Sequence, residues 1–214
     1  MKKIKITNKI IITAIIIFSL SISIYDLVQN NILNSLKKLL IIPIIFIPHF
    51  IRKFLNKDFK YVLETLLLIF VFIGWYLGYA LNIYNIFKPY DKIIHTIFGI
   101  VVCFFSIYII KLFNTYKNSN VWFNIIFFIS FSLALGVIWE IIEFADDKIF
   151  GKNEQGVIET GVDDTMYDLI VTLIGSAIFC ICYYYELIFK KELIIKKYIK
   201  LLNWINIKYM INCL

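Results

Sequence analysis

Long apolar runs without charged residues recur along the whole chain, and lysine-rich or turn-forming segments separate them. Several runs approach the length of about 20 residues that a helix needs to cross the hydrocarbon core of a bilayer. The runs are continuous rather than alternating, which indicates helices and not the strands of a barrel. The pattern therefore predicts an all-α, polytopic membrane bundle of about six spans, at residues 10–28, 33–51, 65–81, 93–110, 121–144 and 169–185.

The second predicted span is the weakest of the six. Its uncharged part, residues 39–51, has thirteen residues and contains Pro43 and Pro48. A start at Leu33 gives nineteen residues if Lys37 and Lys38 extend towards the membrane surface. Proline removes a backbone donor from a helix, so we expect a kink in this span.

The two ends of the chain differ from the other segments. Residues 10–28 follow four lysines and could form a signal peptide, but the apolar run outlasts a signal core and favours a retained anchor. Residues 188–214 carry six lysines between apolar pairs, which is too many charges for a span. We expect one transmembrane bundle over residues 1–187 and a basic amphipathic tail on the cytoplasmic membrane surface.

Composition and charge agree with a membrane protein and give it an orientation. Hydrophobic residues make up 61% of the chain, against about 45–50% in a soluble domain. The net charge of +7 does not indicate nucleic acid, because the lysines flank apolar runs. If the N-terminus is inside, 16 of the 22 basic residues lie on the inner side, which predicts that both termini are cytoplasmic.

Three predicted helix ends meet at the outer face, and each carries a polar pair three or four residues apart. That spacing puts both side chains of a pair on one helix face. The pairs are Asp91 with His95, Glu140 with Glu143, and Asp164 with Asp168. Asp91 could be only a helix N-cap, and Asp168 could belong to a capping box with Thr165.

The pair Glu140 and Glu143 points most strongly to a function. A carboxylate inside a span costs about 2.5–3.5 kcal/mol, and two on one helix face repel each other unless a cation or a proton lies between them. Carboxylates with one imidazole suit Zn²⁺, Mn²⁺ or Mg²⁺. We therefore expect His95, Glu140, Glu143 and Asp168 to form a metal or proton site, and Asp91 or Asp164 to orient His95 or act as a base.

Small residues on the same predicted spans favour close helix packing in lipid. They would bring the polar faces of the spans together. These glycines are Gly74, Gly78, Gly99, Gly136 and Gly175.

The order and spacing of these residues resemble the YjdF inner-membrane family over about residues 60–187. The resemblance is carried by Asp91-Lys92-Ile93-Ile94-His95, Gly99, Gly136-x-x-Trp139-Glu140-x-x-Glu143-Phe144-x-Asp146, Gln155, Asp164-Thr165-Met166-x-Asp168-Leu169 and Gly175. More loosely, the opening Asp-Lys-x-x-His and the late Asp-x-x-x-Asp resemble VanZ-like proteins. The resemblance implies a multi-pass protein of a prokaryotic plasma membrane, with the six polar residues as signature positions, and it supplies no mechanism.

Three functions fit the sequence. The first is a metal-assisted enzyme that acts at the outer leaflet on a lipid-linked or envelope substrate. The second is a transporter whose carboxylates hold a cation or a proton. The third is a non-catalytic envelope factor in which the acids cap helices and pack against polar groups. Sequence alone does not decide whether the protein is an enzyme.

Overall fold

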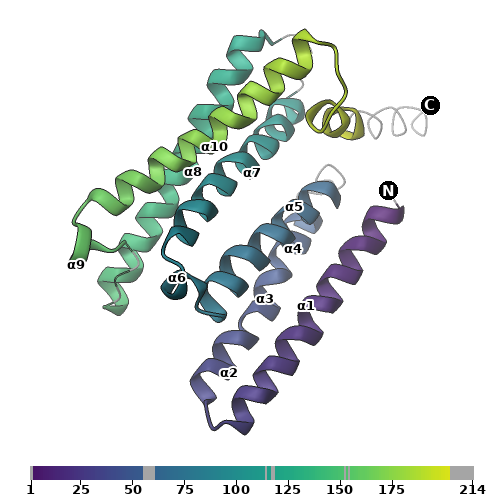
Figure 1. The fold of residues 1–214 in the computed structure, drawn as a ribbon. Helices are drawn as coiled ribbons and strands as arrows, with labels where there is room; N and C mark the ends of the chain where they lie inside the picture. The colour runs from purple at the N-terminus through teal and green to yellow at the C-terminus, as the bar shows by residue number, and fades with distance from the viewer. Residues whose placement is uncertain are drawn as a thin grey trace. The chain divides into compact units, whose positions relative to one another are not determined.

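The computed structural model describes residues 2–54, 61–113, 115–116, 119–151, 153 and 155–202, and every regular element in them is a helix. This confirms the predicted all-α class. The long helices are α1 (Lys2–Val28), α5 (Tyr61–Val71) with the π-helix η2 (Phe72–Ala80), α7 (Pro89–Leu112), α8 (Val121–Phe150) and α10 (Asp163–Ile188). The short helices are α2 (Ile32–Leu39), α3 (Ile41–Ile45), α4 (Ile47–Phe54), α6 (Ile83–Ile86) and α9 (Val157–Thr160) (Figure 1).

Five helices among the described residues are long and apolar enough to cross a membrane. They are Ile4–Val28, Tyr61–Ala80, Pro89–Leu112, Val121–Ile149 and Asp163–Ile188. They correspond to five of the six predicted spans. The polytopic helical membrane fold that the apolar runs predict is therefore confirmed.

The remaining predicted span, residues 33–51, is broken into the three short helices α2, α3 and α4. Leu40 and Phe46 form the turns between them. Pro43 and Pro48 cannot donate the backbone hydrogen bonds that a continuous helix needs, so the hydrogen-bond pattern is interrupted near each proline. The sequence predicted one kinked helix here, and the structure has three short helices joined through two residues, Leu40 and Phe46, that keep right-handed helical backbone angles.

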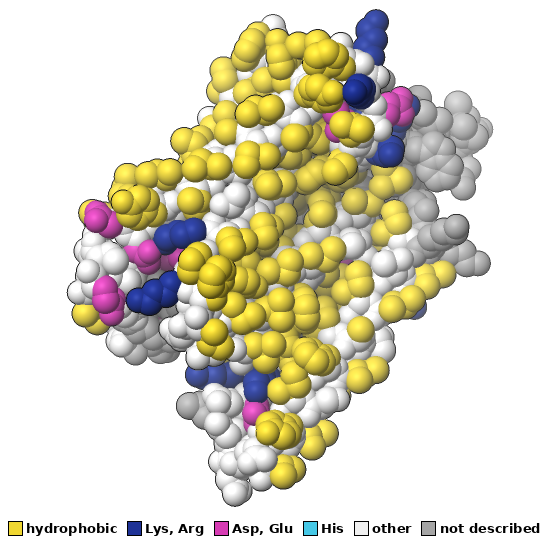
Figure 2. Space-filling model, in the orientation of Figure 1, with side chains coloured by type: hydrophobic (Ala, Val, Ile, Leu, Met, Phe, Trp, Pro, Cys, Tyr) yellow, Lys and Arg dark blue, Asp and Glu magenta, His cyan; other side chains and the backbone are white. Residues whose placement is uncertain are grey.

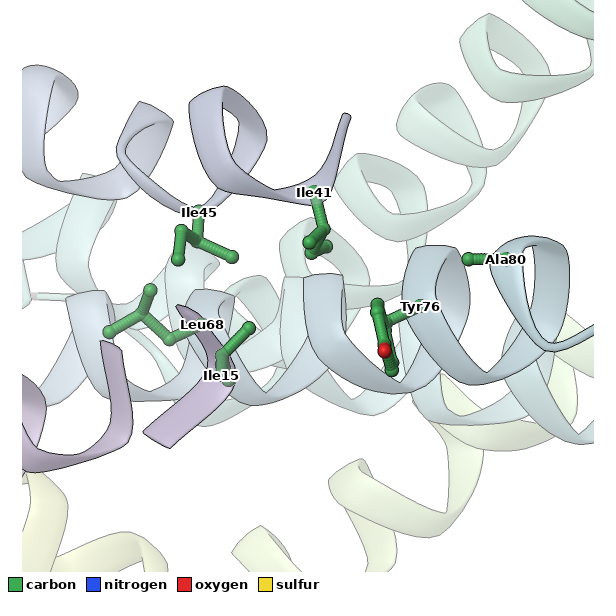
Figure 3. Close-up of a cluster of buried hydrophobic side chains, with 6 residues drawn as sticks. All are labelled: Ile15, Ile41, Ile45, Leu68, Tyr76 and Ala80. Carbon is green, nitrogen blue, oxygen red and sulfur yellow. The ribbon is translucent and has the colours of Figure 1, made fainter. Parts of the chain in front are cut away.

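The chain divides into two compact units, Met1–Ile94 (unit 1) and His95–Leu214 (unit 2), and the division falls within α7. Nothing in the apolar pattern predicts this division. Unit 1 is built around a small apolar core between α1, α3, α5 and η2 (Figure 3). Its members are Ile15, Ile41, Ile45, Leu68, Tyr76 and Ala80. The short helix α3 thus supplies two core residues although it does not span by itself.

A buried ion pair joins α1 to α2 in unit 1. The Lys38 ammonium donates to Asp26 Oδ2 at 2.5 Å, and both side chains are buried. One turn away, the Ser23 and Ser35 hydroxyls lie 2.5 Å apart. The sequence predicted that Lys38 extends to the membrane surface. The structure corrects this, because Lys38 turns inward to neutralise Asp26.

The two glycines of the third span have different surroundings. A Cβ on Gly78 would lie 2.3 Å from Cε2 of the Tyr84 ring, so this ring packs where only glycine leaves room. A Cβ on Gly74 would meet Ile94 Cγ2 at an ordinary 3.8 Å. The close contact at Gly78 is therefore to an aromatic ring after the span and not to a second long helix.

Unit 2 contains most of α7, together with α8 and α10, and α10 packs along α8 (Figure 1). The Asn120 side chain caps α8 by accepting a hydrogen bond from the Trp122 N–H, and α8 ends at Gly151, whose φ of +64° glycine adopts without strain. Figure 2 shows hydrophobic side chains over the visible sides of unit 2 and charged side chains near its ends. This distribution suits a body surrounded by lipid.

The Asp26–Lys38 pair provides a test of how unit 1 is held together. We expect Lys38→Met to lower the free energy of unfolding by about 3–5 kcal/mol, because it leaves a buried carboxylate without its cation. The double change Asp26→Asn with Lys38→Met should recover most of that loss. Unfolding in detergent by titration with dodecyl sulfate measures both. The control is Lys37→Met, which removes only a cation–π contact to Tyr79. Equal stability of Lys38→Met and Lys37→Met would contradict this account.

Candidate functional site

The four residues of the predicted metal or proton site come together in unit 2, and we call them the His95 cluster. His95 lies on α7, Glu140 and Glu143 on α8, and Asp168 on α10. Asp168 is in the second turn of its helix. Glu140 is nineteen residues beyond the start of α8, which places it about 28 Å along that helix. The cluster therefore lies nearer the end of α8 than its start, and nearer the starts of α7 and α10 than their ends.

The imidazole of His95 lies between carboxylates of two other helices. Its Nδ1 is 3.9 Å from Glu140 Oε1, and its Nε2 is 3.9 Å from Asp168 Oδ1. All three residues are buried, with exposed fractions of 3% for His95, 5% for Glu140 and 2% for Asp168. Both distances exceed the usual range of a nitrogen–oxygen hydrogen bond, about 2.7–3.2 Å. The two ring nitrogens thus face two different acids.

Glu143 is positioned by a tryptophan of the same helix. The Trp139 indole N–H donates to Glu143 Oε1 at 2.7 Å. The Trp139 ring also lies edge-on to the His95 ring, with 5.8 Å between centroids, and it contacts Phe98 at 5.5 Å. One aromatic side chain therefore contacts both an acid and the imidazole of the cluster. The sequence pattern did not predict this role for Trp139, although Trp139 precedes Glu143 by the four residues that place them on one face.

The nitrogen and oxygen atoms of the cluster lie close enough to share one ion. His95, Glu140 and Glu143 each offer one ligand atom, and these atoms lie within 4.8 Å of one another. A cation at their centre would need only small side-chain movements to reach bonds of about 2.0–2.2 Å. These three residues are part of the ligand set of three carboxylates and one imidazole that the sequence predicts, and Asp168 is not in this group of three.

Two side chains near the His95 cluster donate hydrogen bonds to backbone carbonyl groups of the cluster residues. The Thr172 hydroxyl of α10 donates to the carbonyl oxygen of His95 at 3.3 Å. The Gln155 side-chain amide donates to the carbonyl oxygen of Glu140 at 3.2 Å and to the Thr165 hydroxyl at 3.0 Å. Gln155 is itself buried, and its position in a loop carries no periodicity that would have identified it. These bonds join the backbone of α7 and α8 at the cluster to α10 and to the loop that holds Gln155.

The two predicted catalytic acids lie one helical turn from the cluster residues. Asp91 precedes His95 on α7, belongs to unit 1 and accepts a hydrogen bond from Lys92 at 3.1 Å. Asp164 precedes Asp168 on α10 and is half-buried below the loop at Gly156, where an added Cβ would lie 2.9 Å from Asp164 Oδ2. Within unit 2, the structure therefore brings His95, Glu140, Glu143 and Asp168 together and leaves Asp164 at the edge of the group.

Close contact between α7 and α10 places two of the cluster residues. A Cβ on Gly99 would lie 2.3 Å from the carbonyl oxygen of Thr172, and a Cβ on Gly175 would lie 2.1 Å from the carbonyl oxygen of Thr96. Both obstacles are backbone atoms, so no side chain can move to make room. A Cβ on Gly136 would instead meet the Thr172 methyl at 3.4 Å, which is an ordinary contact. Glycine is thus required on α7 and α10 and not on α8.

Electrostatics favour a positive charge close to such a group. A charged side chain in the middle of a span costs about 2.5–3.5 kcal/mol, and like charges on one helix face add repulsion. The cluster brings three carboxyl groups and one imidazole together from three helices. A divalent cation or a shared proton would lower the repulsion between these acids.

Comparisons with known proteins support the membrane assignment. The family described as "Predicted membrane protein (DUF2238)" matches residues 7–187, a range that includes the whole His95 cluster. A protein of Thermotoga maritima, described as uncharacterized, is 31% identical to this chain over 134 residues. That match covers 61% of this chain and 66% of the Thermotoga protein, just under two thirds of its length. No solved structure matches the chain significantly.

The glycine contacts give a test of the packing that shapes the site. We expect Gly99→Ala and Gly175→Ala each to lower the free energy of unfolding by about 1–3 kcal/mol, because the added methyl group forces α7 and α10 apart. Gly136→Ala is the matched control and should be neutral or slightly stabilising, since alanine favours a helix. Thermal unfolding of the three purified variants in one detergent measures this. Equal losses at all three positions would show that the helix contact is not the cause.

Proposed function

Since the chain belongs to the DUF2238 family of predicted membrane proteins, we propose that it works within the bilayer and that unit 2 binds one divalent cation there. The observation that carries this proposal is the convergence of His95, Glu140 and Glu143. Their ligand atoms come from two helices and lie within 4.8 Å of one another. Zn²⁺, Mn²⁺ and Mg²⁺ are the candidate ions, because each accepts carboxylate oxygens and the first two accept imidazole readily.

The surrounding residues support separate roles for the two sides of the imidazole. His95 Nδ1 faces Glu140 and would bind the ion, while Nε2 faces Asp168. A carboxylate on the second ring nitrogen commonly fixes the tautomer of a metal-binding histidine and makes it a better ligand. Asp168 therefore acts as the residue that orients His95, and Trp139 orients Glu143 in the same way through its indole N–H.

The position of the cluster indicates the class of substrate. Its place near the starts of α7 and α10 would put it at headgroup depth, and the neighbouring α8 side chains Ile138, Ile141 and Ile142 are exposed, which suits contact with lipid. A bound divalent ion would supply Lewis-acid activation of a phosphoryl or carbonyl oxygen or of water. A lipid-linked or envelope molecule would reach such a site from the membrane. Asp164, at the edge of the cluster, is the nearest candidate within unit 2 for a general base, with Asp91 one turn from His95 on α7.

The proposal includes an orientation. The distribution of lysines and arginines predicts cytoplasmic termini in a prokaryotic plasma membrane, with the His95 cluster towards the outer face. The resemblance to YjdF-like and VanZ-like proteins stays a prediction and adds no mechanism to this proposal.

The same geometry favours one alternative. An imidazole between two buried carboxylates can also hold and exchange a proton, which is what a proton-coupled transporter needs. In that case the protein would bind no stoichiometric metal. A non-catalytic envelope factor would need neither a metal nor a proton at this position.

Metal content distinguishes these functions. We expect detergent-purified wild type to carry about one divalent ion per chain by inductively coupled plasma mass spectrometry, after exposure to Zn²⁺, Mn²⁺ and Mg²⁺ and removal of excess ions. The double variant His95→Ala with Glu140→Gln should lose it while it elutes as the same monodisperse species. Asp163→Asn is the matched control, because Asp163 is an exposed acid at the same end of α10. Wild type without metal would refute the metal site, and movement of protons by the protein in liposomes would then favour transport.

A further inference from the structure

The chain after α10 folds back onto unit 2 as a short helix at residues 195–202, which we call the tail helix. Its apolar side chains are buried at exposed fractions between 3% and 9%. These residues are Ile195, Tyr198, Ile199 and Leu202. An amphipathic helix that lies on a membrane would turn these side chains into lipid. The tail helix instead packs them against protein, so its polar face is the one left open.

Specific hydrogen bonds fix the tail helix in this orientation. The buried carboxylate of Glu186, near the end of α10, accepts the backbone N–H groups of Ile194, Ile195 and Lys196 at 2.7–3.0 Å. It therefore fills the anion-binding end of the tail helix. Further along, the Tyr198 hydroxyl donates to the carbonyl oxygen of Phe104 on α7 at 3.0 Å.

A second bond from α7 adds to this attachment. The Lys111 ammonium donates to the carbonyl oxygen of Ile199 at 2.8 Å. The tail helix is thus held from two helices of unit 2, α7 and α10. Its position is a property of the fold and does not need a membrane surface to define it.

The open face of the tail helix and the segment at residues 190–194 before it are strongly basic, and we call the two together the basic tail face. Among its lysines, Lys190, Lys191, Lys197 and Lys200 are exposed and Lys196 is half-buried. The one acid between them is Glu192, whose pKa is lowered by the hydrogen bond from Lys200 and which therefore stays ionised. Five lysines less one glutamate give this surface a charge of +4.

The aromatic residues around this surface are of the kind that lies at headgroup depth. Trp122 and Tyr184 are exposed at the same end of unit 2, with their rings 5.8 Å apart. Tyr185 is also exposed, and the Lys191 ammonium donates to its hydroxyl at 3.0 Å. Trp and Tyr concentrate where hydrocarbon meets headgroups in membrane proteins. The lysines that follow α10 are therefore next to the phosphates of the leaflet in which α10 ends.

We propose that the basic tail face binds the headgroups of anionic phospholipids in that leaflet. Its charge is opposite to that of these lipids, and lysines close to a membrane surface each strengthen binding to acidic lipids. The interaction goes beyond the proposed metal site and does not depend on it, because the two lie at opposite ends of α10. A soluble polyanion such as nucleic acid would match the charge but not the belt of exposed aromatic side chains.

The test compares lipid classes on the full-length protein. Native mass spectrometry of the detergent-purified chain, titrated with dioleoylphosphatidylglycerol or dioleoylphosphatidylcholine, gives the affinity for each. We expect phosphatidylglycerol to bind more tightly, and its affinity to fall by about tenfold in Lys197→Gln with Lys200→Gln, since each lysine contributes several-fold. The arginine double variant at the same positions should retain binding because the charge is kept.

The matched control removes two exposed lysines outside the basic tail face, with Lys88→Gln and Lys148→Gln. Its affinity for phosphatidylglycerol should equal that of wild type. Equal binding of the two lipids to wild type, or full binding of phosphatidylglycerol to the Lys197/Lys200 glutamine variant, would overturn the proposal. Displacement of phosphatidylglycerol by a short single-stranded RNA at equal charge concentration would also overturn it, because that result would assign the surface to a soluble polyanion.

Discussion

An ionised carboxylate inside a bilayer must have compensating charge or hydrogen-bond donors within a few ångströms, and this constraint accounts for much of the structure. Asp26 accepts a hydrogen bond from the Lys38 ammonium at 2.5 Å, and this contact joins α1 to α2. Glu64, buried at the start of α5, lies 3.3 Å from His49 on α4. Glu186 accepts three backbone N–H groups and thereby docks the tail helix. Each buried acid connects elements that apolar packing alone would leave free to slide.

The His95 cluster satisfies the same constraint in a different way. Its imidazole faces two acids at 3.9 Å, which is longer than the contacts that neutralise the other buried carboxylates. Three acidic groups also outnumber the one imidazole. Close packing of α7 against α10 at Gly99 and Gly175 prevents the helices from separating to relieve this concentration of charge. Under the proposed function, a divalent cation would bind to this concentration of acidic groups.

Local sequence pattern predicted the long helices and the spacing of the polar pairs, because both depend on neighbours within one or two turns. The pattern failed where a side chain pairs with a residue that is far away in the sequence. The pattern predicted Lys38 near the membrane surface, and only the fold shows that the Lys38 ammonium pairs with the buried Asp26 carboxylate. The break of residues 33–51 into three helices depends on Ile41 and Ile45 finding places in the core of unit 1. The placement of residues 188–214 on the membrane surface stays a prediction, and what the pattern did not show is that the carboxylate of Glu186 binds the start of the helix at residues 195–202. Residues 203–214 lie outside the described part of the chain.

The most direct measurement of the central claim is electron paramagnetic resonance of the Mn²⁺-loaded protein, with pulsed detection of nitrogen coupled to the ion. The account predicts coupling to a single imidazole nitrogen, which persists in His49→Gln and disappears in His95→Gln at equal manganese content. The chain has only these two histidines, so the assignment would be complete. Bound manganese without any nitrogen coupling, or coupling that disappears with His49, would contradict the proposed site.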